Sequence, residues 1–439
     1  HNLLGREPAG LSGLTSPQVV VARSLMPADA VQVNRTVLLG FATEQGGKTS
    51  HTAIMARSLN IPAVVGLHGV LGEIDQGAEV LLDGYSGVLI VNPSEQTLYE
   101  YGGVEVRQKR VEQELTGLRE SASTLQDGRH IVLSANIERP DDVEQLKLSG
   151  ADGVGLFRTE YLYFNRDDLP DEEEQTAAYR SVAGALGEKP VIIRTLDLGG
   201  DKLHAKLHSE SEENPFLGWR AIRVCLERRD IFRTQLRAIL RASTAGKVKL
   251  MFPMISGLAE LRQAKAALEE CRGELRREGV DFDEKMEVGV MIEVPSAALI
   301  ADLLAKEVNF FSLGTNDLVQ YAVAVDRTNE RIAHLYEPTH PAVLRLIKTT
   351  ADAAHAAGIW VGLCGEMGGD ILLTPLLIGL GLDELSCGAS VLPRVKRAVR
   401  SLDMATCQAL AGEALKAETG NAVLQQCEEV ARARYPELL

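Results

Sequence analysis

The feature that most constrains this chain is a regular alternation of apolar and helical segments from about residue 129 onward. Eight short apolar segments predict strands, at 131–136, 153–158, 191–197, 249–254, 288–293, 310–315, 360–364 and 384–388. Stretches between them, such as LAELRQAKAALEECRGELRRE, have the periodicity of amphipathic helices. This alternation predicts an α/β fold that closes into a (β/α)8 TIM barrel. An open doubly wound sheet is the alternative, but no G-x-G-x-x-G motif follows the early strands.

Basic side chains recur where the predicted strands end, which is the rim at which such barrels carry their active sites. They are Arg158, Arg194, Lys202, Arg220 and Arg327. Because guanidinium groups match phosphate and carboxylate oxygens, the set predicts a site for a multiply charged anion. One such arginine alone is more often an ordinary salt-bridge partner. Their recurrence at one rim favours a binding site.

Carboxylates and a thiol occur at the same rim. Glu293 ends the fifth predicted strand, and Asn316 and Asp317 follow the sixth. Two carboxylates from adjacent strands suit a hard cation such as Mg²⁺, although either one alone could simply cap a loop. Cys364 ends the seventh strand, and a lone cysteine is more often an inert buried thiol than a catalytic group.

Residues 1–94 form a small α/β domain by the same criteria. Apolar runs at 19–23, 37–41, 62–66, 79–82 and 88–91 predict strands, and Asp83-Gly84 predicts a hairpin turn between the last two. One helix is expected from about Thr52 to Leu59. Residues 95–128 are highly charged and predict a helical linker with a narrow stripe of Val111, Leu115 and Leu118. The barrel then occupies residues 129–439.

The stretch GGKTSHTAIMARSLNIPAVVG, residues 46–66, places His51 just after a pair of glycines. Ser50 or Thr49 is a suitable cap for the following helix, so His51 would lie in its first turn. The positive end of a helix disfavours an imidazolium and would stabilise a phosphoryl group attached to the ring. In isolation, a histidine that merely starts a helix explains this stretch better.

Length and composition narrow the class of protein. A chain of 439 residues is expected to form two or three domains, and its net charge of −15 argues against nucleic-acid partners. Six scattered cysteines without metal-binding spacing favour a reducing cytoplasm. No stretch predicts a membrane span or a secretory signal. Because the chain begins with histidine, we expect it to be a fragment or a processed product.

Six motifs together resemble one family. They are GGKTSHTAIMARSLNIPAVVG, GVGLFRTEYLYFNRDDLP, IIRTLDLGGDK, ENPFLGWRAIR, FFSLGTNDLVQYAVAVDR and GLCGEMGGD. Their sequence and order resemble Enzyme I of the bacterial sugar phosphotransferase system, the phosphoenolpyruvate–protein phosphotransferases, over nearly the whole chain.

The resemblance implies that phosphoenolpyruvate phosphorylates His51. It implies substrate binding by Arg158, Arg194, Asn316, Asp317 and Arg327, with help from Lys202 and Arg220. It further implies that Glu293 and Asp317 hold Mg²⁺, and that Cys364 protonates the departing enolate to give pyruvate. The family resemblance also implies a homodimer formed through the barrel, with a histidine domain that swings between sites.

The carrier protein HPr is the phosphoryl acceptor that the resemblance implies for an intact parent. The family's helical HPr-docking subdomain and its first strand have no counterpart in this sequence, so we expect transfer to HPr from the parent rather than from this chain. The nitrogen-related branch of the family is a close variant.

Two further alternatives remain at this stage. A fragment of a pyruvate phosphate dikinase or phosphoenolpyruvate synthase would share the histidine domain and barrel, but the ATP-grasp domain of those enzymes is not seen upstream, and their histidine motif tends to carry methionine in place of Lys48. A non-catalytic phosphoenolpyruvate sensor would not need to keep both His51 and Cys364.

Overall fold

The computed structural model describes residues 16–24, 37–47, 56, 61–84, 86–164, 166, 168–199, 212–329 and 331–439, without side chains at 103–110 and 112. His51 and Lys202 lie outside the described residues, as does most of the helix expected at 52–59. The chain divides into two compact units, His1–Glu112 and Gln113–Leu439. Each unit is described by itself.

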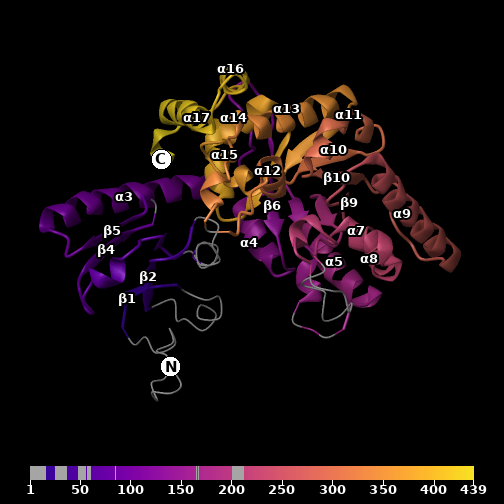
Figure 1. The fold of residues 1–439 in the computed structure, drawn as a ribbon, viewed down its shortest axis with the longest axis horizontal. Coiled ribbons are helices and arrows are strands. Elements are labelled where there is room, and N and C mark those ends of the chain that lie inside the picture. The colour runs from indigo at the N-terminus through magenta and orange to yellow at the C-terminus, as the bar shows by residue number, and fades with distance from the viewer. Residues whose placement is uncertain are drawn as a thin grey trace, which may run out of the picture. The chain divides into compact units, whose positions relative to one another are not determined.

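The first unit contains two small sheets (Figure 1). Strands β1 (Gln18–Ala22), β2 (Leu38–Thr43) and β3 (Ala63–Val65) are parallel and adjacent in that order. Strands β4 (Val80–Asp83) and β5 (Val88–Val91) form an antiparallel pair, which confirms the predicted hairpin. A 3-10 turn, η3, spans Val70–Gly72. The five predicted strands of this unit are therefore all present.

The core of this unit is built around the central strand β2, in which every residue except Leu39 is buried. Leu38 and Phe41 of β2 are buried and pack with Ala56. Val20, Ile61 and Ala63 pack against the same cluster. Burying apolar side chains of this size contributes roughly 1.5–3 kcal/mol each to folding, so this cluster gives the small unit its own core.

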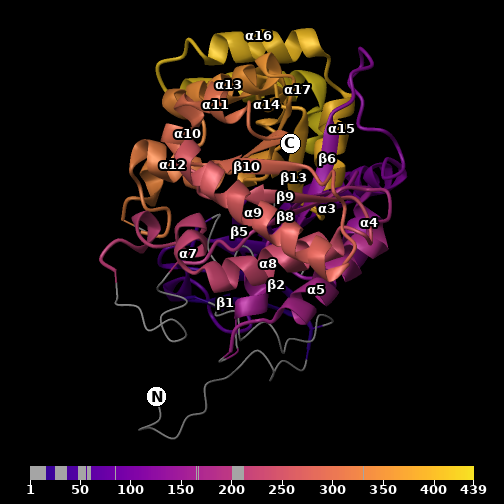
Figure 2. The same ribbon diagram turned by 90° about the vertical axis from the view of Figure 1, so that its right-hand side faces the viewer.

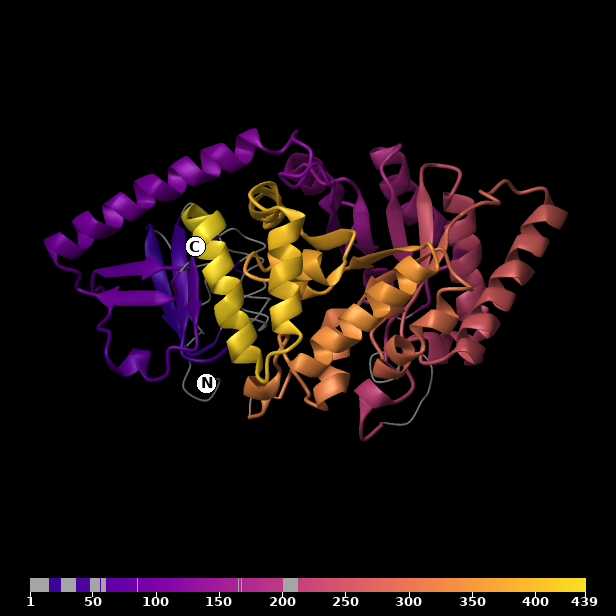
Figure 3. The ribbon, with the colours of Figure 1, turned by 90° about the horizontal axis from the view of Figure 1, so that it is seen from above.

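A single helix, α3 (Glu95–Gly117), follows the hairpin and appears as one continuous rod in Figure 3. The Ser94 hydroxyl accepts a hydrogen bond from the backbone N–H of Thr97 at 3.1 Å, as an N-cap does. The predicted apolar stripe is only partly used. Leu115 is buried and Val111 is half-buried, whereas Leu118 lies just beyond the helix end.

The second unit is a closed barrel of parallel strands, which confirms the predicted fold class (Figures 1 and 2). Its strands are β6 (Val132–Ile137), β7 (Val154–Phe157), β8 (Val191–Arg194), β9 (Val248–Phe252), β10 (Val288–Ile292), β11 (Phe310–Leu313), β12 (Trp360–Leu363) and β13 (Glu384–Gly388). Each pairs with its neighbours in chain order, and β13 closes the sheet onto β6. Their β-branched and other apolar residues suit strands that are covered on both faces.

Helices follow the strands around the outside of the barrel. They are α4 (Asp142–Ser149), α5 (Glu172–Leu186), α7 (Ile222–Glu227), α8 (Arg229–Ala242), α9 (Leu258–Glu278), α10 (Pro295–Leu299), α11 (Ala301–Leu304), α12 (Thr315–Val323), α13 (Pro341–Ala356), α14 (Thr374–Leu380), α15 (Leu392–Arg400), α16 (Met404–Ala414) and α17 (Gly420–Arg434). Short 3-10 turns are η4 (Glu160–Tyr163), η5 (Pro215–Leu217), η6 (Ala333–Leu335), η7 (Glu366–Gly369) and η8 (Pro436–Leu438). No helix within the described residues is long and apolar enough to cross a membrane.

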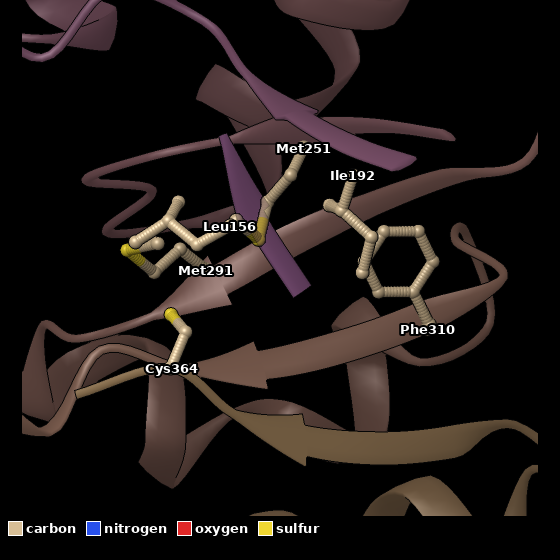
Figure 4. Close-up of a cluster of buried hydrophobic side chains, with 6 residues drawn as sticks. All are labelled: Leu156, Ile192, Met251, Met291, Phe310 and Cys364. Carbon is tan, nitrogen blue, oxygen red and sulfur yellow. The ribbon is translucent and has the colours of Figure 1, made fainter. Parts of the chain in front are cut away.

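Apolar side chains fill the inside of the barrel. Leu156, Ile192, Met251, Met291, Phe310 and Cys364 form one buried cluster, contributed by successive strands and by the residue after β12 (Figure 4). The Trp360 ring stacks on Phe310 with ring centroids 4.6 Å apart. The interior is thus a packed core rather than a channel, which leaves the strand ends as the place for polar chemistry.

The sequence placed the end of the third barrel strand too far along the chain. The prediction ran to residue 197, whereas β8 ends at Arg194. The backbone N–H of Leu196 donates to the side chain of Gln235, and that of Asp197 to Glu160, instead of to a neighbouring strand. The apolar run in the sequence does not reveal that these N–H groups bond to side chains, because the acceptors are brought there by tertiary contacts.

Candidate active site at the carboxyl rim of the barrel

Eight of the predicted site residues are described, and all of them lie at the carboxyl ends of barrel strands, in the loops that follow, or in the first turn of α12. They are Arg158, Arg194, Arg220, Glu293, Asn316, Asp317, Arg327 and Cys364. Parallel strands bring their carboxyl ends to one rim, so residues far apart in the chain become neighbours there. The structure does not test Lys202 or His51, which lie outside the described residues.

Arg194 holds two carboxylates at the end of β8. Its Nη2 atom lies 3.1 Å from Oε1 of Glu160, and its Nη1 atom lies 2.8 Å from Oδ2 of Asp197. The guanidinium is buried, and its charge is met by carboxylates on both sides. These carboxylates raise the pKa of Arg194 in spite of its burial, so the group stays cationic.

Arg220 continues the same chain of charges from the loop that precedes α7. Its Nη2 atom lies 2.8 Å from Oδ1 of Asp197 and 3.1 Å from Oδ2 of Asp317. Arg327 then approaches the other oxygen of Asp317, with Nη2 at 3.3 Å from Oδ1. Burial opposes ionisation of Asp197, but Arg194 and Arg220 outweigh it and lower the pKa of that carboxyl. The rim therefore carries an alternating row of buried positive and negative groups.

Unlike Glu160, Asp197 and Asp317, Glu293 has no arginine within salt-bridge distance among the described residues. It is 2% exposed, and its Oε1 atom accepts a hydrogen bond from the backbone N–H of Met254 at 2.6 Å. Burial, and then the negative charges of Asp317 and Asp197, raise the pKa of Glu293 to about 8. A methyl group at Gly314 would lie 2.6 Å from Oε2 of Glu293, so the glycine leaves room for this carboxylate.

Glu293 and Asp317 are the residues predicted to hold a magnesium ion. Within the described ranges, no group of three or more His, Cys, Asp or Glu side chains is gathered as a metal site. After burial, the negative charge of Asp317 is the next cause of the raised pKa of Glu293. Mg²⁺ is commonly held by one or two carboxylates together with water and substrate oxygens. Two carboxylates are therefore sufficient protein ligands for it.

Cys364 directly follows β12, and its side chain points into the barrel toward Leu156 and Met291 (Figure 4). It is 3% exposed, and its Sγ lies 3.8 Å from the carbonyl oxygen of Leu313. Burial raises the pKa of the Cys364 thiol to about 11, so it remains protonated at neutral pH. The group is therefore a proton donor rather than a thiolate nucleophile.

Arg158 and Asn316 occupy more open positions on the rim. The Arg158 side chain is 35% exposed, and its Nη1 atom pairs with Oε1 of Glu138 at 2.5 Å. The side-chain oxygen of Asn316 accepts a hydrogen bond from the backbone N–H of Glu366 at 2.9 Å, which ties α12 to η7. The half-exposed guanidinium is the group that an incoming anion could contact with least rearrangement.

Two non-glycine residues beside the site have a positive φ: Met254 (φ 56°), whose N–H donates to Glu293, and Ala221. Ala221, which follows Arg220, has φ 53° and ψ −127°, a conformation that glycine adopts far more readily. Its N–H donates to the carbonyl of Leu198 at 3.1 Å. Strained residues of this kind persist where the surrounding structure requires them, often at functional sites. Here the strain accompanies the placement of the Arg220 side chain.

Sequence reasoning gave no role to three residues that the structure places in this network. Glu160 and Asp197 are the carboxylates that flank Arg194, and the Tyr321 hydroxyl accepts from Nη1 of Arg220 at 3.3 Å. Tyr321 also donates to the carbonyl of Phe216 at 2.5 Å. Its position four residues after Asp317 on a helix was the available signal, because such residues share one face.

Comparison with known protein families gives one match for the first unit and one for the second. Residues 14–87 match the family "PEP-utilising enzyme, mobile domain", and residues 112–404 match "PEP-utilising enzyme, PEP-binding domain". A phosphoenolpyruvate-protein phosphotransferase of Staphylococcus carnosus is 46% identical over 428 residues, covering 98% of this chain and 75% of that protein. The chain belongs to the phosphoenolpyruvate-protein phosphotransferase family.

Other members of this phosphotransferase family give the same result. The protein of Priestia megaterium is 50% identical over 404 residues, which cover 92% of this chain and 70% of that protein. The protein of Geobacillus stearothermophilus is 52% identical over 393 residues, which cover 89% of this chain and 68% of that protein. Because these relatives are phosphotransferases, the dikinase or synthase alternative is not favoured.

Proposed function

We propose that this chain catalyses the first step of the sugar phosphotransferase system, in which phosphoenolpyruvate phosphorylates His51 and pyruvate is released. The row Arg194–Asp197–Arg220–Asp317–Arg327 at the barrel rim is the observation that carries the proposal. A phosphoryl group and a carboxylate on one small molecule need several cations held in fixed places, and transfer of a phosphoryl group depends chiefly on such positioning and charge stabilisation.

Three groups are suited to bind the substrate first. Arg158 and Arg327 are partly exposed, so their guanidinium groups can reach an incoming anion. The Nε atom of Arg194 is buried and has no hydrogen-bond partner among the described residues. Its N–H is therefore available to donate a hydrogen bond to the substrate. The proposed substrate set is completed by Asn316, Asp317, Arg220 and Lys202.

The magnesium ion is assigned to Glu293 and Asp317. Burial, and then the negative charge of Asp317, raise the pKa of Glu293, and a divalent cation would offset both effects. When bound, Mg²⁺ supplies positive charge to the phosphoryl and carboxylate oxygens of the substrate. The residues of the chain would hold the substrate against it.

The proposed reaction transfers a phosphoryl group to His51 and a proton from Cys364 to the departing enolate. The bond between phosphorus and the enol oxygen breaks as an imidazole nitrogen of His51 bonds to phosphorus. The enolate that leaves takes a proton at its methylene carbon from the Cys364 thiol, which gives pyruvate, and water returns a proton to the thiolate. Because burial keeps Cys364 protonated at neutral pH, the proton is available when the enolate forms.

The organisation around this reaction is proposed from the family. Residues 1–94 would be the mobile phosphohistidine domain, residues 95–128 the linker and residues 129–439 the phosphoenolpyruvate-binding barrel. We assign the chain to the cytoplasm, as a homodimer through its barrel, and name HPr as the protein that receives the phosphoryl group from an intact parent.

The test is incubation with Mg²⁺ and phosphoenolpyruvate labelled in its phosphoryl group, beside a His51→Ala control. We expect pyruvate together with acid-labile, alkali-stable label that depends on His51. Tight phosphoenolpyruvate binding without label or pyruvate would contradict the proposal and favour a sensor. Omitting Mg²⁺, and separately replacing Glu293 with Gln, should each abolish label if these carboxylates hold the ion.

A further inference from the structure

Just beyond β8, the N–H of Thr195 still donates to the carbonyl of Met251 on β9 at 3.0 Å, but the main-chain groups around it are held by side chains. The N–H of Leu196 donates to Oε1 of Gln235 at 2.8 Å, and the carbonyl of Arg194 accepts from the Thr159 hydroxyl at 3.1 Å. These two bonds fix the peptide groups on either side of Thr195. The position of this short segment determines where the side chains of its two ends, Arg194 and Asp197, are directed.

Gln235 is the centre of this arrangement. It lies on α8, which packs beside α5 outside the barrel (Figures 1 and 2), and its side chain is 0% exposed. While its Oε1 accepts from Leu196, its Nε2 donates to the Thr159 hydroxyl at 3.1 Å and to the Tyr179 hydroxyl at 3.1 Å. One amide therefore holds both Leu196 directly and Arg194 through Thr159.

The network ends inside the barrel wall and not at the surface. The Tyr179 hydroxyl donates to Oε1 of Gln175 at 3.0 Å, and Nε2 of Gln175 donates to the carbonyl of Pro170 at 3.1 Å. Gln175, Tyr179 and Gln235 are all buried. Burying three polar side chains is unfavourable unless each is hydrogen-bonded, and apolar residues would fill the same space at lower cost. Their presence here needs a reason other than packing.

We propose that Gln235 is a positioning residue for the phosphotransfer reaction, acting through Leu196 and Thr159 to fix the end of β8. This inference rests on the proposed function, because it takes Arg194 and its partner Asp197 as part of the substrate site. Gln235 does not touch the charged groups itself. A displacement of the order of 1 Å in a binding group is enough to lower a rate by about a hundredfold. A small shift of Arg194 would therefore slow phosphotransfer measurably.

A structural role for Gln235 makes a different prediction from a positioning role. If the amide only stabilises the fold, its loss lowers the melting temperature and leaves substrate affinity unchanged in the folded fraction. If it positions Arg194, its loss weakens phosphoenolpyruvate binding and slows transfer at temperatures where the protein is fully folded. The comparison therefore needs a variant that loses an equivalent buried bond elsewhere.

The control is Ser243→Ala. Ser243 caps the end of α8, is buried, and accepts a hydrogen bond from the backbone N–H of Asp283 at 2.7 Å. Like Gln235, it is a buried side-chain acceptor for a main-chain N–H, but Asp283 leads into β10 at the opposite rim. Both substitutions leave a main-chain donor unpaired, so both should lower the melting temperature.

The test compares Gln235→Met, which keeps the side-chain volume, with Ser243→Ala. Melting temperature, phosphoenolpyruvate affinity by calorimetry and label transfer to His51 are measured for both. We expect Gln235→Met to weaken binding at least fivefold and to lower kcat/KM by about ten- to a hundredfold. Ser243→Ala should change neither by more than about twofold at a comparable loss of melting temperature. Equal affinities and rates in the two variants would overturn the inference.

Two additions keep the test decisive. If Gln235→Met fails to fold, Thr159→Val removes only the hydroxyl that connects Gln235 to Arg194, and it should produce the same loss of affinity; an unchanged affinity would overturn the inference. If the wild-type chain binds phosphoenolpyruvate but transfers no label, the proposed function fails. The calorimetric comparison then still decides whether Gln235 positions the binding site.

Discussion

Arg220 and Asp317 are separated by 97 residues in the chain, yet Nη2 of Arg220 donates to Oδ2 of Asp317 at 3.1 Å in the buried rim of the barrel. The same nitrogen lies 2.8 Å from Oδ1 of Asp197. One guanidinium thus joins the loop after β8 to helix α12. This geometry uses the fork of arginine and has no equivalent for a single ammonium group.

Replacing Arg220 with Lys should therefore be far from conservative. A lysine can approach one carboxylate and leaves the other buried without its partner, which costs about 3–5 kcal/mol when a buried pair is broken. We expect kcat/KM for phosphoenolpyruvate to fall at least about a hundredfold, measured by pyruvate release. Arg228→Lys is the control, because Arg228 pairs with Asp230 at the surface, and it should remain close to wild type. Similar activities in the two variants would contradict the assigned role.

The Cys364 thiol should show an unusual pH profile of alkylation. Burial places its pKa at about 11, and only the thiolate reacts. We expect the rate of iodoacetamide modification of Cys364, followed by peptide mass spectrometry, to rise about tenfold per pH unit from pH 8 to pH 10. An unperturbed thiol would level off near pH 9. A plateau there would show that the thiol is not desolvated, and protection by phosphoenolpyruvate would place it at the substrate site.

Gly150 is required at the end of α4 by close approach as well as by backbone angle. It has φ 74° and ψ 29°, and a methyl group there would lie 2.1 Å from the carbonyl oxygen of Arg119. Gly279 ends α9 with nearly the same angles, φ 69° and ψ 28°, and faces open space. Gly279→Ala should cost about 1–2 kcal/mol of unfolding free energy, since only the backbone is strained.

Gly150→Ala should cost about 1–3 kcal/mol more than Gly279→Ala, because the added methyl group also forces the backbone near Arg119 to move. Denaturant unfolding of the two variants measures the difference. The same carbonyl of Arg119 accepts from the buried ammonium of Lys396 at 2.8 Å, which limits how far it can shift. Equal losses of unfolding free energy in the two variants would show that the Arg119 carbonyl moves aside without a cost in stability.

The strained Ala221 offers a test of stability against function. Its φ of 53° and ψ of −127° cost an alanine about 1–3 kcal/mol, which glycine would avoid. Glycine adds about 0.5–1 kcal/mol of unfolded-state entropy, so Ala221→Gly should raise stability by roughly 1 kcal/mol. We also expect a higher KM for phosphoenolpyruvate, because the backbone beside Arg220 gains freedom. A lower melting temperature would show that the alanine is not strained.

Much of the fold follows from local pattern. Every strand predicted for the barrel is present, because runs such as VGVMIE and FFSLGT are apolar, short and bounded by turn residues. The segment after Arg194 was assigned to a strand in error, since its apolar residues are as suited to a strand as those before it. Its hydrogen bonds go to Gln235, 39 residues further along on α8, and to Glu160 of the preceding βα unit, and no local signal announces them.

The sequence by itself determined the types of group at the rim. Arginines, carboxylates and a thiol stand at strand ends, and parallel strands in a closed barrel must bring those ends together. Only the tertiary structure decided which group pairs with which. Loop path and burial place Asp197 between two arginines and leave Glu293 facing Asp317 and Asp197, so two carboxyl groups of one rim acquire opposite pKa shifts. Electrostatic interactions depend on distance and desolvation, and neither is encoded in the local order of residues.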